Sequence, residues 1–235
     1  MRVLALDTSM QHGTAALVDE GRVLAEITFL AGHAQAEKMF PMLDALFSLA
    51  GLGKGDVDLL AVGVGPGGFT SVRVGLSTAK GLSLARGVPV VGLPSLRALA
   101  RTLSPAGGRA AAFVDAGRGE VYAALYDLDA GRALVEPTLG EAGALVAHID
   151  ATAGGDYVLG GDGLLKYGDA IAAGAPSARV VSTAFREIRG SALAFEALRV
   201  HAEEGPSDVD SLEPLYVRPS DAALPKTPLR DPSAI

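Results

Sequence analysis

One stretch of this chain could wrap closely around a phosphate group. Gly65, Gly67 and Gly68 surround Pro66, and backbone without side chains can turn tightly or let another group approach. Thr70 then places a hydroxyl where a helix would begin. The stretch therefore predicts a close approach either to a phosphate or to another protein.

A second stretch, Asp7-Thr8-Ser9, combines a carboxylate with two hydroxyl groups directly after an apolar strand. The carboxylate could organise a phosphate through a metal ion or water, with the hydroxyls as donors. Alternatively, Asp7 and Ser9 hydrogen-bond the backbone of their own turn, as short polar side chains commonly do. The candidate phosphate-binding residues are Asp7, Thr8, Ser9, Gly65, Gly67 and Gly68.

The residues from Gly63 to Gly68 also match G-x-G-x-x-G between a strand and a helix, which is a dinucleotide-binding signature. That fold needs an acidic residue about 20 positions further on to hold a ribose. The next acidic residue here is Asp115, and no lysine stands where a P-loop would place one. A dinucleotide or P-loop enzyme is therefore not expected.

The sequence holds few residues that could bind a metal ion or act as a nucleophile. The histidines are His12, His33, His148 and His201, and no two are four apart, the spacing that puts two imidazoles on one helix face. There is no cysteine, so thiolate nucleophiles and zinc-thiolate sites are excluded. We expect no catalytic residue and no metal site, and proteolysis has little support.

The glycine turn is held between a buried strand at 59–64 and a helix of unusually small residues that ends at Gly87. Glycine inside a helix costs about 1 kcal/mol relative to alanine. Gly75 and Gly81 therefore suggest close packing against another backbone. A strand at 88–93 and a helix from Ser95 to Leu103 should follow.

The chain before the turn reads as a meander of three antiparallel strands at 3–6, 14–18 and 23–29, followed by a helix at 34–50. Pro41 should kink this helix or mark its true start. The helix is apolar around most of its circumference, so its own domain or a partner must cover it.

Composition limits the kind of protein. Of 235 residues 49% are apolar, enough for a substantial core, and the net charge of −7 argues against general nucleic-acid affinity. No acidic residue occurs from Leu59 to Val114, which indicates either a buried segment or a basic surface for a phosphate or an acidic partner. Without a long apolar run or a signal peptide, we expect a soluble cytoplasmic protein and no membrane partner.

The second half of the chain repeats the beginning. Asp115 lies 108 positions after Asp7, and strand, turn and strand residues match at the same offset. A helix at 140–149, strands at 157–159 and 180–181, and a helix at 191–204 should follow. We expect an N-terminal lobe at 1–106, a C-terminal lobe at 107–221 and a mobile tail at 222–235.

Two duplicated halves that each open with a meander resemble the α/β fold of the actin-like, hexokinase and Hsp70 ATPases. Within that superfamily the chain resembles the TsaB (YeaZ) family. The resemblance rests on DTS at 7–9, GPGGFTSVRVG at 65–75, AKGL at 79–82, VVGLPSL at 90–96, DAGRGEVY at 115–122 and LEPLYVR at 212–218. It departs at Gly68, where the family usually has serine, and at Ser71, where glycine is common.

The resemblance implies a non-catalytic scaffold that activates a TsaD-like transferase, which makes N6-threonylcarbamoyladenosine beside the tRNA anticodon. It implies further contact with a TsaE-like ATPase and with tRNA only through the complex. When isolated, the chain could form a homodimer, and the sequence leaves homodimer and monomer open. No cofactor should be tightly bound, although ATP or ADP could lie at a partner interface. The implied partner-contact residues are Met39, Met42, Leu46, Val72, Arg73, Gly75, Leu76, Ala79 and Lys80. The alternative is an independent ATP-dependent phosphotransferase of the same superfamily.

Overall fold

The computed structural model describes residues 1–32 and 34–218, so the tail predicted at 222–235 lies outside the described residues. The first half of the chain forms a strand meander followed by alternating helices and strands. Its elements are β1 (Arg2–Asp7), β2 (His12–Asp19), β3 (Arg22–Leu30), α1 (Gln35–Ala50), β4 (Leu59–Gly63), α2 (Phe69–Arg86), β5 (Val90–Leu93) and α3 (Ser95–Leu103).

The second half follows the same order of elements. They are β6 (Arg109–Gly117), β7 (Glu120–Asp127), β8 (Arg132–Glu141), α4 (Ala142–Ala153), β9 (Tyr157–Gly160), α5 (Leu164–Gly174), β10 (Ala178–Val180) and α6 (Gly190–Glu204). Short 3₁₀ turns occur at Lys54–Asp56 and Thr183–Phe185. Helix α5 was not predicted from the sequence. It contains two glycines and a non-helical residue, Tyr167, that breaks its periodicity.

Each half builds one five-stranded sheet with the same topology. The strand orders are β3-β2-β1-β4-β5 and β10-β9-β6-β7-β8, the second being the first read from its other edge. In both sheets the meander is antiparallel and the later strands join in parallel. The duplication predicted from the 108-residue offset is therefore present in the fold.

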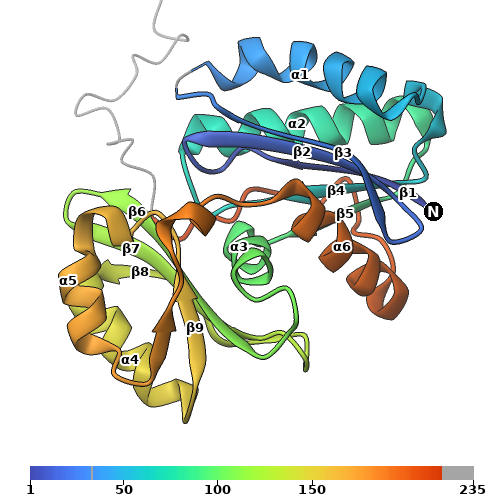
Figure 1. The fold of residues 1–235 in the computed structure, drawn as a ribbon. Helices are drawn as coiled ribbons and strands as arrows, with labels where there is room; N and C mark the ends of the chain where they lie inside the picture. Colours follow the sequence, from blue (N-terminus) through green and yellow to red (C-terminus); the bar gives the residue numbers. More distant parts are fainter. Residues whose placement is uncertain (33, 219–235) are drawn as a thin grey trace, which may run out of the picture.

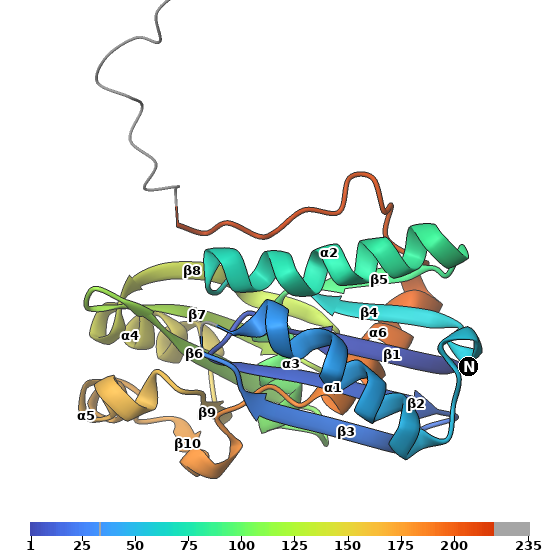
Figure 2. The ribbon, with the colours of Figure 1, turned by 90° about the horizontal axis from the view of Figure 1, so that it is seen from above.

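The layers run from α1 and α2, through the first sheet, to α3 and α6, then through the second sheet to α4 and α5 (Figure 1). Both α1 and α2 cover the outer face of the first sheet (Figure 2). Buried side chains from both sheets and from α3 and α6 form one continuous core between the sheets. The two halves therefore share their central core.

Helices α3 and α6 cross between the halves. Helix α3 follows β5 of the first sheet but packs on β6 and β7, whereas α6 follows β10 and packs on β1 and β2. Helix α6 and the segment after it were assigned from the sequence to the C-terminal lobe. In the structure they lie against the first sheet, which corrects that part of the domain division.

No helix in the described ranges is both long enough and apolar enough to cross a lipid bilayer.

Candidate functional site

The carboxylate of Asp7 lies at the carboxyl end of β1 and is 1% exposed. Its Oδ1 accepts hydrogen bonds from the backbone nitrogen and the hydroxyl of Ser9, at 2.8 and 2.7 Å. Its Oδ2 accepts a bond of 2.6 Å from the hydroxyl of Ser95, whose oxygen in turn accepts the Gly65 N–H at 3.1 Å. Burial raises the pKa of Asp7, although the bonds from Ser95 and Ser9 oppose that shift.

The glycine turn packs directly onto this aspartate turn. A Cβ at Gly67 would lie 2.1 Å from the carbonyl oxygen of Ser9, and a Cβ at Gly63 would lie 1.7 Å from Oδ2 of Asp7. The Gly68 N–H donates to the Ser9 carbonyl oxygen at 2.9 Å. Glycine is therefore needed at 63 and 67 because two turns of the same chain meet there.

Thr8 fastens the turn to helix α2. Its hydroxyl donates to the Ser71 carbonyl at 2.6 Å and accepts the Gly75 N–H at 3.1 Å. A Cβ at Gly75 would lie 2.6 Å from the Thr8 hydroxyl oxygen, so this helical glycine also marks a close contact within the chain.

The structure thus brings together the six residues proposed from the sequence as a phosphate site. It also shows that the carboxylate and both hydroxyls have partners within the chain. Asp7 and Ser9 hydrogen-bond each other and the neighbouring turn, which is the structural alternative weighed from the sequence. These bonds account for the residue types without a ligand.

The equivalent turn of the second half is more open. Asp115 accepts the Gly117 N–H at 3.0 Å and lies 3.6 Å from the amine of Lys166. The backbone nitrogen of Asp115 donates to the Asp162 carboxylate at 3.0 Å. Burial, together with the nearby charges of Glu187 and Asp115, raises the pKa of Asp162 to about 6.

Two sets of polar side chains, not identified from the sequence, join the halves. The Nδ1 atom of His12 lies 2.8 Å from a carboxylate oxygen of Glu187, which precedes α6. Glu196 of α6, with a side chain 1% exposed, pairs with Arg97 and Arg101 of α3 at 2.8 and 2.9 Å. All three contacts connect residues about 95 or more positions apart, so no local pattern could reveal them.

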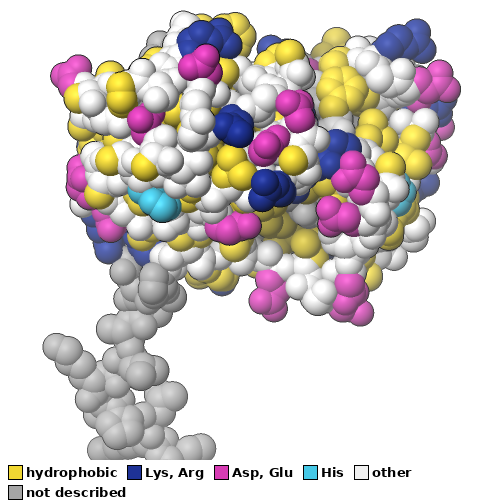
Figure 3. Space-filling view, turned by 90° about the horizontal axis from the view of Figure 1, so that it is seen from below, with side chains coloured by type: hydrophobic (Ala, Val, Ile, Leu, Met, Phe, Trp, Pro, Cys, Tyr) yellow, Lys and Arg dark blue, Asp and Glu magenta, His cyan; other side chains and the backbone are white. Residues whose placement is uncertain are grey.

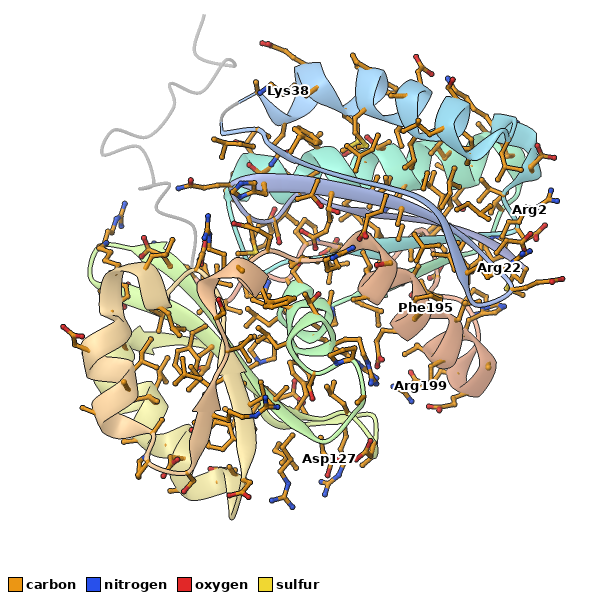
Figure 4. The ribbon with its side chains drawn as sticks, in the orientation of Figure 1. Arg2, Arg22, Lys38, Asp127, Phe195 and Arg199 are labelled. Atoms are coloured by element: carbon orange, nitrogen blue, oxygen red, sulfur yellow. The ribbon has the colours of Figure 1, made fainter. Side chains whose placement is uncertain are left out.

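The two arginines of α3 extend the Glu196 cluster to the turns of the second sheet. Arg97 also donates to the Gly131 carbonyl at 2.9 Å, and Arg101 donates to the Leu128 carbonyl at 3.0 Å. Arg199, labelled on α6 in Figure 4, adds a third cation 2.9 Å from Glu196. Burial alone would raise the pKa of Glu196, but the bond from Arg199 and the charges of Arg101 and Arg97 lower it overall.

The segment after α6, residues 205–218, is called the closing strap. It runs beside α2 along the length of that helix (Figure 2). In the sequence, only the LEPLYVR resemblance marked the end of this strap.

The residues chosen from the resemblance as partner contacts mostly face inward. Seven of the nine are buried in the chain's own core, whereas Arg73 is exposed and Lys80 is half-buried. The seven buried residues are Met39, Met42, Leu46, Val72, Gly75, Leu76 and Ala79. This corrects the choice of residues, because apolar periodicity marks the face of a helix that covers its own sheet.

Other residues carry the outward faces of the same helices. Phe40 and Leu49 of α1 are 61% and 71% exposed, and Leu84 of α2 is 70% exposed. Between the helices lies a shallow pocket of about 50 Å³ lined by Phe40, Phe47, Leu82 and Arg86, among others. The α1–α2 surface is defined here by the exposed apolar side chains Phe40, Leu49 and Leu84 and by this pocket.

The face seen from below differs from the α1–α2 surface. Acidic and basic side chains are interspersed over it (Figure 3), and no extended area of one charge covers the described part of this face. Within residues 1–32 and 34–218, no three His, Cys, Asp or Glu residues are placed to hold a metal ion.

A family model described as TsaD, tRNA N6-adenosine threonylcarbamoyltransferase, matches residues 29–155, just over half of the chain's 235 residues. The TsaB protein of Escherichia coli K12, a tRNA threonylcarbamoyladenosine biosynthesis protein, is 36% identical over 131 residues. That match covers 55% of this chain and 56% of the relative. The chain therefore spans about half the length of the curated relatives it matches.

Solved structures extend the likeness over almost the whole described fold. YeaZ from Pseudomonas aeruginosa is 27% identical with a TM-score of 0.76, over 92% of this chain and 99% of that one. The ROK hexokinase of Thermus thermophilus is 16% identical with a TM-score of 0.53, over 85% of this chain and 99% of that one, and shows the fold alone. The predicted duplicated, actin-like α/β fold is confirmed.

Proposed function

The chain belongs to the TsaD family, and from that membership and its likeness to TsaB we propose that it is a non-catalytic subunit in tRNA threonylcarbamoyladenosine biosynthesis. In this role it binds and activates a TsaD-like transferase in the cytoplasm. A TsaE-like ATPase joins the same assembly, and tRNA is reached through the complex. The isolated chain forms a homodimer through the surface that the transferase would cover.

The observation that carries the non-catalytic role is the bonding of the Asp7 turn. In an enzyme of this superfamily, a carboxylate after the first strand would have to be available to a phosphate or its metal ion. Here both oxygens of Asp7 bond to Ser9 and Ser95, and Gly67 of the glycine turn packs against the Ser9 carbonyl. The polar groups of residues 7–9 therefore join the end of β1 to α2 and α3.

The α1–α2 surface is the proposed contact for the transferase. Large apolar side chains more than 60% exposed on two adjacent helices favour association, because association removes that area from water. Arg86 lines the pocket, whereas Lys54 is paired with Asp44 at 2.7 Å, so the partner is expected to bring apolar side chains and one acidic side chain near Arg86.

Substitution of an exposed leucine tests this contact. We expect Leu84→Asp to abolish co-purification with the TsaD-like partner, because it places a charge at an exposed apolar position of the proposed contact. Leu165→Asp is the matched control, since Leu165 lies on α5 of the other half and is 61% exposed. Equal loss in both variants, or in neither, would remove the α1–α2 surface from the proposal.

A measurement of ATP hydrolysis distinguishes the independent phosphotransferase from the subunit role. The purified chain alone should hydrolyse ATP no faster than a buffer blank. Sustained hydrolysis that disappears in Asp7→Asn, in a protein of unchanged secondary structure, would replace the subunit role with an enzymatic one.

A further inference from the structure

The closing strap is bonded to the first sheet along its early part. The Ser207 N–H donates to the Val90 carbonyl at 2.8 Å, and the Ser207 hydroxyl accepts the Gly92 N–H at 3.1 Å. The Leu212 side chain occupies the space above Gly92, where a Cβ would lie 2.4 Å from Cδ1 of the leucine. Lys80 of α2 donates to the Leu212 carbonyl at 3.2 Å.

Further along, the strap reaches the first turn of α2. The Leu215 N–H donates to the Val64 carbonyl at 2.7 Å. The Tyr216 hydroxyl accepts a 2.8 Å bond from Nε of Arg73, and the Tyr216 ring stacks on Phe69 with centroids 5.4 Å apart. The Arg73 guanidinium lies 3.7 Å from the centre of the Phe69 ring, a favourable cation–π distance.

The last described residue of the strap is bonded to the second sheet. Arg218 donates to the Ala116 carbonyl at 2.9 Å and to a carboxylate oxygen of Glu120 at 2.7 Å. Ala116 and Glu120 flank the turn that follows Asp115, the second-half counterpart of the Asp7 turn. The Arg218 side chain thus connects the strap to the turn between β6 and β7 in the other half.

The two anchors are close together along the chain. Three peptide units separate Leu215, which bonds to Val64 directly after β4, from Arg218, whose guanidinium bonds to β6 and β7, and they span at most about 11 Å. This stretch and the extended Arg218 side chain together can absorb only a limited shift of the halves before one anchor breaks. Tyr216, which contacts α2, lies between the anchors and must follow any such movement.

We propose that the closing strap couples the spacing of the two halves to the first turn of α2. When the halves shift relative to each other about their shared core, Arg218 pulls Tyr216 away from Phe69 and Arg73. When a ligand holds the first turn of α2 in place, the strap holds the halves at one spacing. The further consequence, that a partner on α2 senses this spacing, rests on the proposed function.

The spacing is measured without any partner. The chain has no cysteine, so Arg22→Cys and Asp169→Cys introduce two unique spin-label sites, one exposed in each half. In this background Arg218→Ala should broaden the distance distribution between the labels and shift its mean to a longer distance. Glu213→Ala, at an exposed strap residue, is the control and should leave the distribution unchanged.

Hydrogen exchange of the same variants measures how the first turn of α2 responds. Residues 66–76 should exchange faster in Arg218→Ala than in the parent chain, while residues 164–174 of α5 exchange at the same rate. If the distance distribution between the labels broadens while exchange at 66–76 is unchanged, the strap only holds the halves together, and the proposed coupling is overturned. An unchanged distribution would overturn it as well.

If Arg218→Ala does not fold, Arg218→Lys keeps the charge but cannot span both acceptors in the geometry of the arginine fork. It should give a smaller change in the same direction in both measurements. A lysine variant identical to the parent chain would contradict the proposal. Because neither readout involves a transferase, failure here leaves the proposed function standing, and the reverse also holds.

Discussion

Two carboxyl groups in this molecule, the buried Glu196 and the half-buried Asp162, have opposite environments. Glu196 is surrounded by three arginines, which lower its pKa overall in spite of burial. Asp162 accepts one backbone N–H and has the acidic neighbours Glu187 and Asp115, so its pKa is raised to about 6. The charged Glu196 carboxylate therefore stabilises the contact between α3 and α6, whereas the charged form of Asp162 is disfavoured in the folded protein.

Asp162→Asn should therefore stabilise the protein in a pH-dependent way. Since the folded-state pKa lies above the ordinary value of 3.8, the contribution of Asp162 is fully present below that value and lost as the pH rises through about 6. Asparagine keeps an oxygen for the Asp115 N–H and carries no charge. In urea unfolding we expect the variant to gain about 1–2 kcal/mol over the parent near pH 8, and little near pH 4. A gain that is equal at both pH values would contradict this account.

Glu196→Gln should be strongly destabilising, because it leaves three arginines around an uncharged group. We expect a loss of about 3–5 kcal/mol in the free energy of unfolding. The effect should shrink as the pH falls and the parent glutamate itself becomes protonated, because the contribution of a lowered pKa is fully present above the unfolded value and is lost as the pH falls through the folded value. Glu203→Gln, which removes an exposed partner of Arg199 on the same helix, should cost less than about 1 kcal/mol.

At the scale of elements, the structure shows which small residues of α2 permit close contacts. Gly75 admits the Thr8 hydroxyl, and Ala79 is fully buried against the first sheet. A Cβ at Gly81 would meet nothing within 4 Å, so this second helical glycine faces open space. Close packing predicted from two glycines thus holds for one of them, and the contact lies within the chain.

The inward and outward faces of α2 should respond differently to charge. Ala79→Glu is expected to lower the free energy of unfolding by roughly 3 kcal/mol or more, because an unpaired carboxylate would be buried. Ser77→Glu, at an exposed position, should leave stability within about 0.5 kcal/mol. Thermal unfolding of both variants, followed by circular dichroism, makes the comparison. A stable Ala79→Glu protein would place Ala79 on the surface after all.

Local signals predicted most elements. Helix α3 starts at Ser95, directly after Pro94, and ends before a Pro/Gly-rich break, and its predicted bounds are those observed. The meander and the glycine turn were equally clear. Contacts between distant residues had no such signal, since the Ser95 to Asp7 bond spans 88 positions. For the same reason, the sequence could not show that α6 packs on the first sheet.

At the scale of the whole molecule, the exchanged helices make the halves interdependent. The buried side chains of the first sheet, of α3 and of the second sheet belong to one core. Without α6, the inner face of β1 and β2 would be exposed to water.

Unfolding should therefore be a single cooperative transition. We expect urea curves followed by circular dichroism and by tyrosine fluorescence to coincide. Residues 1–106 expressed alone should bind a hydrophobic dye and lack a sharp thermal transition, because α6 is missing. A fragment that unfolds cooperatively would show that the first half is independent.

The crossing of α3 and α6 has a consequence for how such a chain could arise. If the connection at 104–108 were cut, each half would be a complete copy of one β-β-β-α-β-α-β-α unit with its last helix covering its neighbour. Two separate chains in that arrangement would be a domain-swapped dimer. The protein is built as such a dimer fused end to end, in which the linker makes permanent an exchange that separate subunits would have to form at each encounter.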